Sequence, residues 1–190
     1  MNRYRERHPD GPEPAVRWLP YQLNPDMPDN GMARADYVMR KFGARGGSVY
    51  SRVALAGKQV GIDFAFDSIK VQPNTVDTHR LMRLAEKAGR QDGMAEELFR
   101  AYFIEGVNLN DKDALADVAA RAGLDRDATR DYLSSDEDRA LIAQADVDAR
   151  VAGVSGVPFF IFNNRIGVSG AQDAAVLLDA MEQSLQASDK

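Results

Sequence analysis

The spacing of hydrophobic and polar positions changes twice along the chain. In residues 15–23 (AVRWLPYQL), Val16 and Trp18 alternate with polar neighbours, which predicts a strand. Between residues 32 and 152, apolar residues recur three and four positions apart, the spacing of amphipathic helices. From residue 153 the strand pattern returns in VPFFIF and IGVS, and AQDAAVLLDAMEQSLQ then reads as a closing helix. The predicted order is strand, helical block, two strands, helix.

Capping residues and glycines divide the helical block. Asp111 and Thr75 stand where N-caps are expected, and Ser134 with Glu137 has the spacing of a capping box. The predicted helices cover residues 34–42, 48–61, 75–89, 91–106, 111–123, 125–133 and 134–153. Asn163 and Asn164 tolerate positive φ, so they predict a tight hairpin turn between the last two strands.

Strands at both ends of a helical block predict one α/β domain interrupted by a helical insertion. The expected parts are residues 1–31, containing the first strand, the insertion at 32–152, and residues 153–190, containing the hairpin and last helix.

Composition limits the function classes. The 190 residues carry a formal net charge of -5, which gives nucleic-acid binding no electrostatic basis. No run approaches the roughly 20 apolar residues that cross a bilayer, and no apolar signal-peptide region follows the first charges. We therefore expect a cytoplasmic protein without nucleic-acid or membrane partners.

The side chains offer little catalytic chemistry. The chain has no cysteine, which excludes disulfides and thiolate ligands, and no GxSxG nucleophile motif. His8 and His79 are too far apart in sequence to predict a metal site. Asn74 and His79 lie in PNTVDTH, which reads either as a helix start with a partly buried histidine or as part of a binding site. No catalytic residue and no metal ligand are predicted.

Four separated stretches together resemble the DsbA-like thioredoxin-fold family, and most closely its FrnE-type branch. They are VRWLPYQLNPDMP, PNTVDTHRL, ELFRAYFIEG and VSGVPFFIFNNRIGVSGAQ, and they occur in the family's order. The resemblance implies an α/β thioredoxin-like fold with a large helical insertion, in which residues 1–31 and 153–190 form the thioredoxin-like domain.

The chain departs from the family pattern at its beginning. The family carries a CxxC pair at the start of its first helix, where the helix dipole stabilises a thiolate. Residues 15–23 match the family's second strand, so the first strand, the CxxC and most of the first helix are expected to be missing. We expect the sheet to form around a gap, which either destabilises the fold or is filled by another chain.

The resemblance also implies a substrate groove. Val157 and Pro158 match the family's cis-proline loop, which holds the substrate backbone in an extended form. Asn74 and His79 would line the other side. The residues expected to border the groove are Ser169, Gly170 and Gln172.

Three functions follow as hypotheses. The first is a DsbA/FrnE-like thiol-disulfide oxidoreductase, without exchange activity in this chain because the CxxC is absent. The second is a glutathione-dependent isomerase of the 2-hydroxychromene-2-carboxylate isomerase type, with glutathione as substrate or cosubstrate and no other cofactor. The third is a non-catalytic thioredoxin-fold module that binds a peptide or thiol. Exposed strand edges also make a homodimer an expected partner arrangement.

Overall fold

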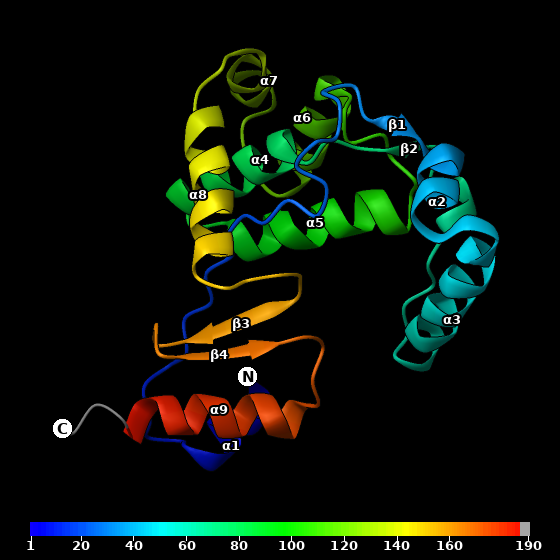
Figure 1. Cartoon of the computed structure of the whole chain (residues 1–190). Coiled ribbons are helices and arrows are strands. Elements are labelled where there is room, and N and C mark those ends of the chain that lie inside the picture. The colour runs from blue at the N-terminus through cyan, green and yellow to red at the C-terminus, as the bar shows by residue number, and fades with distance from the viewer. Residues whose placement is uncertain (187–190) are drawn as a thin grey trace. The chain divides into compact units, whose positions relative to one another are not determined.

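The computed structural model describes residues 1–186 and divides the chain into two units. The larger unit spans residues 24–144, and the smaller unit combines residues 1–23 with 145–190 (Figure 1). Most of the chain is helical, and the strands are few and short. No helix in the described part of the chain is both long and apolar enough to cross a membrane.

The larger unit contains six of the predicted helices. They are α2 (Arg34–Phe42), α3 (Gly46–Gln59), α4 (Val76–Lys87), α5 (Gln91–Phe103), α6 (Lys112–Arg121) and α7 (Arg126–Ser134). Two 3₁₀ turns, Gly43–Arg45 and Phe66–Ser68, interrupt the connections. The structure adds two short strands that the spacing did not predict, β1 (Met32–Ala33) and β2 (Val71–Gln72), which pair antiparallel.

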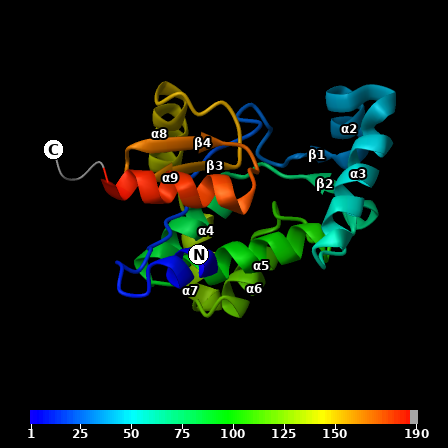
Figure 2. The ribbon, with the colours of Figure 1, turned by 90° about the horizontal axis from the view of Figure 1, so that it is seen from below.

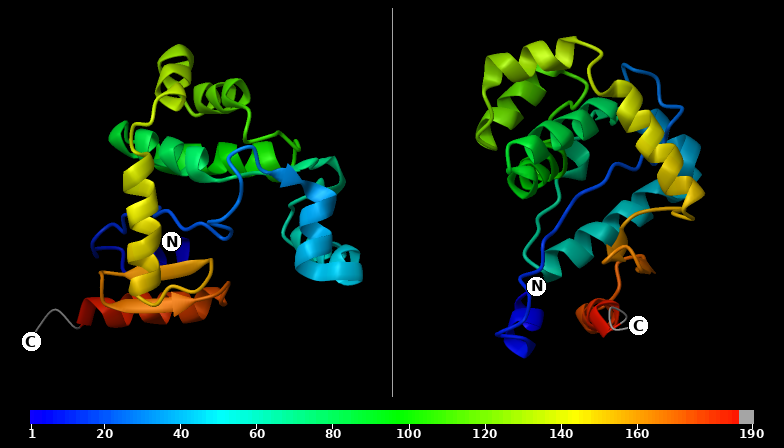
Figure 3. Two further views of the ribbon diagram at one scale, coloured as in Figure 1. Left: turned by 45° about the horizontal axis from the view of Figure 1, so that its top comes forward. Right: turned by 90° about the vertical axis from the view of Figure 1, so that its left-hand side faces the viewer.

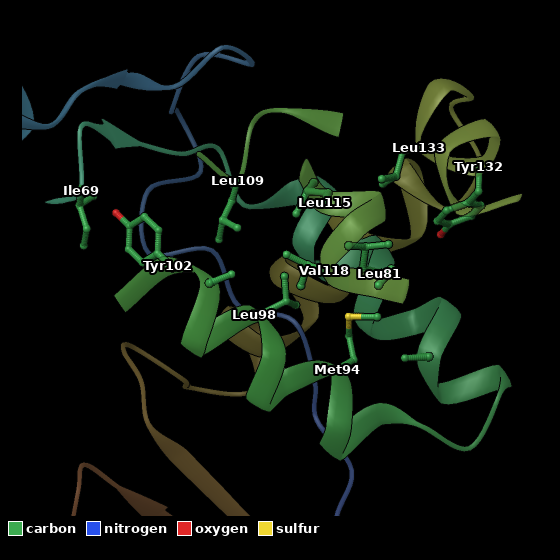
Figure 4. Packing of buried hydrophobic residues seen from close by; sticks show 13 residues of the cluster. Ile69, Leu81, Met94, Leu98, Tyr102, Leu109, Leu115, Val118, Tyr132 and Leu133 are labelled. Atoms are coloured by element: carbon green, nitrogen blue, oxygen red, sulfur yellow. The ribbon is translucent and has the colours of Figure 1, made fainter. Parts of the chain in front are cut away.

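The core of the larger unit lies among α4, α5, α6 and α7 (Figure 4). Its fully buried side chains come from the apolar positions at helical spacing, which explains why periodicity located these helices. The members labelled in Figure 4 are Ile69, Leu81, Met94, Leu98, Tyr102, Leu109, Leu115, Val118, Tyr132 and Leu133.

The helix starts were predicted with mixed success. The Asp111 carboxylate accepts hydrogen bonds from the backbone N–H groups of Asp113 and Ala114, so the predicted N-cap is confirmed. Thr75 occupies the N-cap position of α4 without a side-chain bond, because the neighbouring Asn74 Oδ1 accepts from Val76 N instead, at 2.9 Å. The capping box from Ser134 does not form either, since Ser134 still belongs to α7.

A buried arginine joins the end of α7 to α4. The guanidinium of Arg80 is fully buried and donates to the backbone carbonyls of Tyr132 and Ser135 at 2.6 and 2.9 Å. It also donates to the Glu137 carbonyl at 2.7 Å and to the Asp77 carboxylate at 2.8 Å. Two of these acceptors have a further donor, since Ser135 Oγ donates to the Tyr132 carbonyl at 2.8 Å and Arg139 donates to Asp77 at 3.3 Å. Arg80 is the side chain that bonds all four, so it joins residues 132–137 to α4.

The smaller unit contains α1 (Asn2–Arg7), the C-terminal part of α8 (Arg139–Val151), β3 (Phe159–Phe162), β4 (Ile166–Ser169) and α9 (Ala174–Gln186). β3 and β4 form the predicted antiparallel hairpin, and α9 packs beside it (Figure 2). Asn163 and Asn164 have φ of 50° and 56°, which confirms the predicted turn.

The strand predicted for residues 15–23 is wrong: this segment has no regular secondary structure. No strand in the described part of the chain pairs with it, and Val16 and Leu19 remain exposed. Its end is held by side chains instead, because Asp146 accepts from Gln22 N at 2.6 Å and Arg150 donates to Gln22 O at 2.6 Å. Alternation alone does not make a strand without a neighbour to complete the hydrogen bonds.

Replacing Arg80 tests its role in the fold. We expect Arg80→Leu to lower the free energy of unfolding by about 3–5 kcal/mol, because it removes a charged donor that several buried carbonyls and the Asp77 carboxylate share. Urea unfolding followed by far-ultraviolet circular dichroism measures the change.

The matched control is Arg126→Leu, which breaks the exposed pairs with Asp117 and Asp127 and should cost less than about 1 kcal/mol. Equal losses in the two variants would show that Arg80 has no special role.

Candidate functional site

The first part of the site is the loop that enters β3. The peptide bond between Val157 and Pro158 is cis. Val157 is 49% exposed and Pro158 is also exposed, whereas Val154 at the start of the loop is buried and donates its N–H to Ala149 O at the end of α8. The loop is therefore fixed at its base and open to solvent at its tip.

The second part is the turn that follows β4. Gly170 N donates to Pro158 O at 2.9 Å, which ties this turn to the first loop. Gln172 donates twice, from its backbone N to Gly170 O and from Nε2 to Ser169 O, each at 3.0 Å. The pairing of Phe159 with Ser169 continues this connection into the hairpin.

The structure thus brings together five of the predicted site residues in the smaller unit. Figure 3 lets the reader follow the two loops at the ends of β3 and β4. The five are Val157, Pro158, Ser169, Gly170 and Gln172.

The tip of the first loop has backbone N–H and C=O groups that are free to bind a ligand. Among the described residues, Ser155, Gly156 and Val157 have no hydrogen-bond partner for their N–H and C=O groups. An extended chain offers matching donors and acceptors, so this backbone can bind one by main-chain hydrogen bonds. Sequence reasoning did not single out Ser155 and Gly156, although both lie in the same glycine-bearing stretch, GVSGVP, that precedes β3.

The five side chains bring no proton-transfer group. None of them titrates in the ordinary pH range. Elsewhere in this unit, hydrogen bonds from His8 and Arg7 hold the pKa of Glu182 below its ordinary value, and the hydrogen bond with Asp146 raises the pKa of Arg150.

Asn74 and His79 belong to the larger unit. The Asn74 amide nitrogen donates to Met27 O at 2.7 Å, and its backbone N donates to Asn110 Oδ1 at 3.0 Å. These bonds fix the chain before α4 and give Asn74 a structural role within its own unit. His79 is half-buried in the first turns of α4. That either residue lines the same groove as Pro158 stays a prediction.

Comparison with known proteins now identifies the family. A profile of the DSBA-like thioredoxin domain matches residues 1–182. The chain belongs to the DsbA-like thioredoxin-domain family. It is also similar to the crystal structure of a probable DsbA oxidoreductase from Streptomyces coelicolor, with 25% identity and a TM-score of 0.79. The similarity covers 87% of this chain and 73% of that one. The comparison with curated proteins gave no match.

The family assignment confirms the predicted fold class, a thioredoxin-like mixed α/β fold with extensive helical structure. The 190 residues contain no cysteine, so the CxxC of the family is absent from them. In the described residues, no three His, Asp or Glu side chains converge as they would at a metal site.

Gly170 provides a test of the turn. Its φ of +85° lies in the left-handed region, where a β-branched residue is strained. We expect Gly170→Val to lower the free energy of unfolding of the smaller unit by about 1–3 kcal/mol. Urea titration followed by NMR of the hairpin amides measures it.

Gly156→Ala is the control in the neighbouring loop, because Gly156 has no positive φ and open space at its Cβ position. If both variants unfold at the same urea concentration, the strained turn is not needed for stability.

Proposed function

We propose that this chain is a FrnE-type member of the DsbA-like family that binds an extended peptide or thiol substrate at the loop of residues 155–158. The observation that carries the proposal is the solvent-facing backbone of Ser155, Gly156 and Val157, which has no partner among the described residues. The order of the four family motifs around a helical insertion supports the FrnE-type branch. Ser169, Gly170 and Gln172 would flank the bound chain.

The proposed role is binding without disulfide exchange. Exchange requires a thiolate that attacks a disulfide sulfur, and these 190 residues contain no thiol. The loop residues also lack an ionisable group that could activate a bound nucleophile. The chain as given therefore retains the substrate-holding part of a DsbA-like site and not its reactive part.

An insulin-reduction assay directly tests whether the chain lacks disulfide-exchange activity. We expect this chain not to accelerate the reduction of insulin disulfides by dithiothreitol, so that the rate equals that of the reductant alone. The measurement is the turbidity of the precipitating insulin B chain, with an active thioredoxin as positive control. Turnover above background would refute the proposal that the chain lacks exchange activity.

Binding is tested separately, by amide NMR of the labelled chain titrated with reduced, carboxymethylated insulin B chain or with reduced glutathione. We expect the signals of residues 155–158 to shift. Val157→Glu should weaken peptide binding by about tenfold, because it places a charge where an apolar side chain faces the ligand.

Ile161→Glu is the matched control, since Ile161 in β3 is 48% exposed and Val157 is 49% exposed. If both variants weaken peptide binding equally, the peptide binds at the strand rather than at the loop. Shifts with reduced glutathione alone would favour the isomerase-type function, and no shifts with either probe would overturn the proposed site.

A further inference from the structure

A cavity lies between α4 and α7 in the larger unit and opens to solvent. Its volume is about 310 Å³. Leu84 and Leu124 line it, and both also pack against the buried core. Ala88, which follows the last residue of α4, and Ala128, in the first turn of α7, complete the apolar lining. Because an alanine side chain ends at Cβ, these two positions leave the space beside the leucines unfilled.

Three of the four polar side chains that line the cavity are bonded within the chain. Asp125 Oδ1 accepts from Ala128 N at 2.8 Å, as the N-cap of α7. The Thr129 hydroxyl donates to Asp125 O at 2.6 Å, and the Tyr132 hydroxyl donates to the Asp138 carboxylate at 3.0 Å. Their hydrogen-bonding groups therefore have partners in the fold, and they contribute mainly apolar surface to the cavity.

Lys87 is the fourth polar side chain of the lining. Among the described residues, its ammonium contacts Asp138 at 3.2 Å and Glu137 at 3.6 Å. An ammonium group carries three N–H donors, so one remains for a ligand. Arg83 pairs with the same Asp138 carboxylate at 3.0 Å, so two cations face two carboxylates. The cluster beside the cavity therefore has no net charge with which to hold an ion.

We propose that this cavity binds a compact, uncharged small molecule with an aromatic body and one acceptor oxygen that bonds to Lys87. The apolar lining favours the aromatic body, and the remaining N–H of Lys87 favours a single acceptor. An ion would lose its hydration without a counter-charge, and a peptide would bury backbone groups that the lining cannot satisfy. Since a water molecule in the liquid occupies roughly 30 Å³, a cavity of about 310 Å³ holds about ten non-hydrogen atoms.

Acetophenone has this size and chemistry and serves as the probe. Methyl NMR of the full chain follows Leu84, Leu124 and Ala128 during the titration, and we expect saturable shifts of their signals. α-Methylstyrene has the same shape with a CH₂ group in place of the oxygen, and it should bind about three- to tenfold more weakly. Benzoate has a similar size but carries a charge, and it should leave these signals unchanged.

Three variants locate the ligand. Ala128→Leu fills the cavity and should abolish the shifts of Leu84 and Leu124. Ala120→Leu makes the same change at an exposed position of α6 outside the lining, and it should leave binding intact. Lys87→Met should remove the preference for acetophenone over α-methylstyrene and keep binding of the hydrocarbon. Circular dichroism shows whether each variant is folded.

Four results would overturn the proposal. The first is the absence of saturable shifts with acetophenone. The second is binding that persists in a folded Ala128→Leu variant. The third is equal affinity for acetophenone and either comparison compound. The fourth is a shift of the Leu84 and Leu124 signals when the chain alone is concentrated, which would show that a second copy fills the cavity.

Discussion

The arrangement of the larger unit depends on the burial of one cation, Arg80. The last carbonyls of α7 have no intrahelical donors, and residues 135–137 form an irregular connection to α8. Arg80 supplies hydrogen bonds to both, and its guanidinium stacks on the Tyr132 ring at 4.6 Å from the centroid. The partial negative charge at the end of α7 and the Asp77 carboxylate offset its desolvation. The chain can therefore reverse direction between two helices with its backbone groups satisfied.

A second polar group, the carboxylate of Asp138, also joins α4 to the segment between α7 and α8. The Asp138 carboxylate accepts from the Tyr132 hydroxyl at 3.0 Å and pairs with Arg83 and Lys87 of α4. Burial alone would raise the pKa of Asp138, but hydrogen bonds from Lys87, Arg83 and Tyr132 hold it below its ordinary value. Apolar contacts join α4, α5 and α6, whereas buried polar contacts join α4 to the α7–α8 connection. The charges of this connection are therefore paired within the unit.

The features predicted correctly from the sequence are those determined by residues close together in the chain. Apolar spacing predicted helices at residues 34–42 and 91–106, and the structure has them at 34–42 and 91–103. The Asn163–Asn164 turn follows from residues that tolerate positive φ. Features set by distant partners were not predictable in this way. Residues 15–23 alternate like a strand but lack a neighbouring strand, and α4 is capped by Asn74 because Met27 and Asn110 position it.

The candidate site likewise has some features that nearby residues determine and others that depend on distant contacts. The loop could be located from its glycines and Pro158, but its function came from the family motifs and not from spacing. Its contact with Gly170 depends on the hairpin register, which the Asn163–Asn164 turn sets, so local turn chemistry indirectly positions the site.

A DsbA-like site combines two separable tasks, holding a substrate backbone and attacking its disulfide. The first task needs exposed peptide groups on a rigid base, and the second needs a thiolate of lowered pKa. The loop of residues 155–158 offers exposed peptide groups, and its base is fixed by the Val154 and Pro158 hydrogen bonds. Because main-chain hydrogen bonds do not involve the sulfur, loss of the thiols removes the chemistry and leaves substrate affinity as the property on which the proposed function rests.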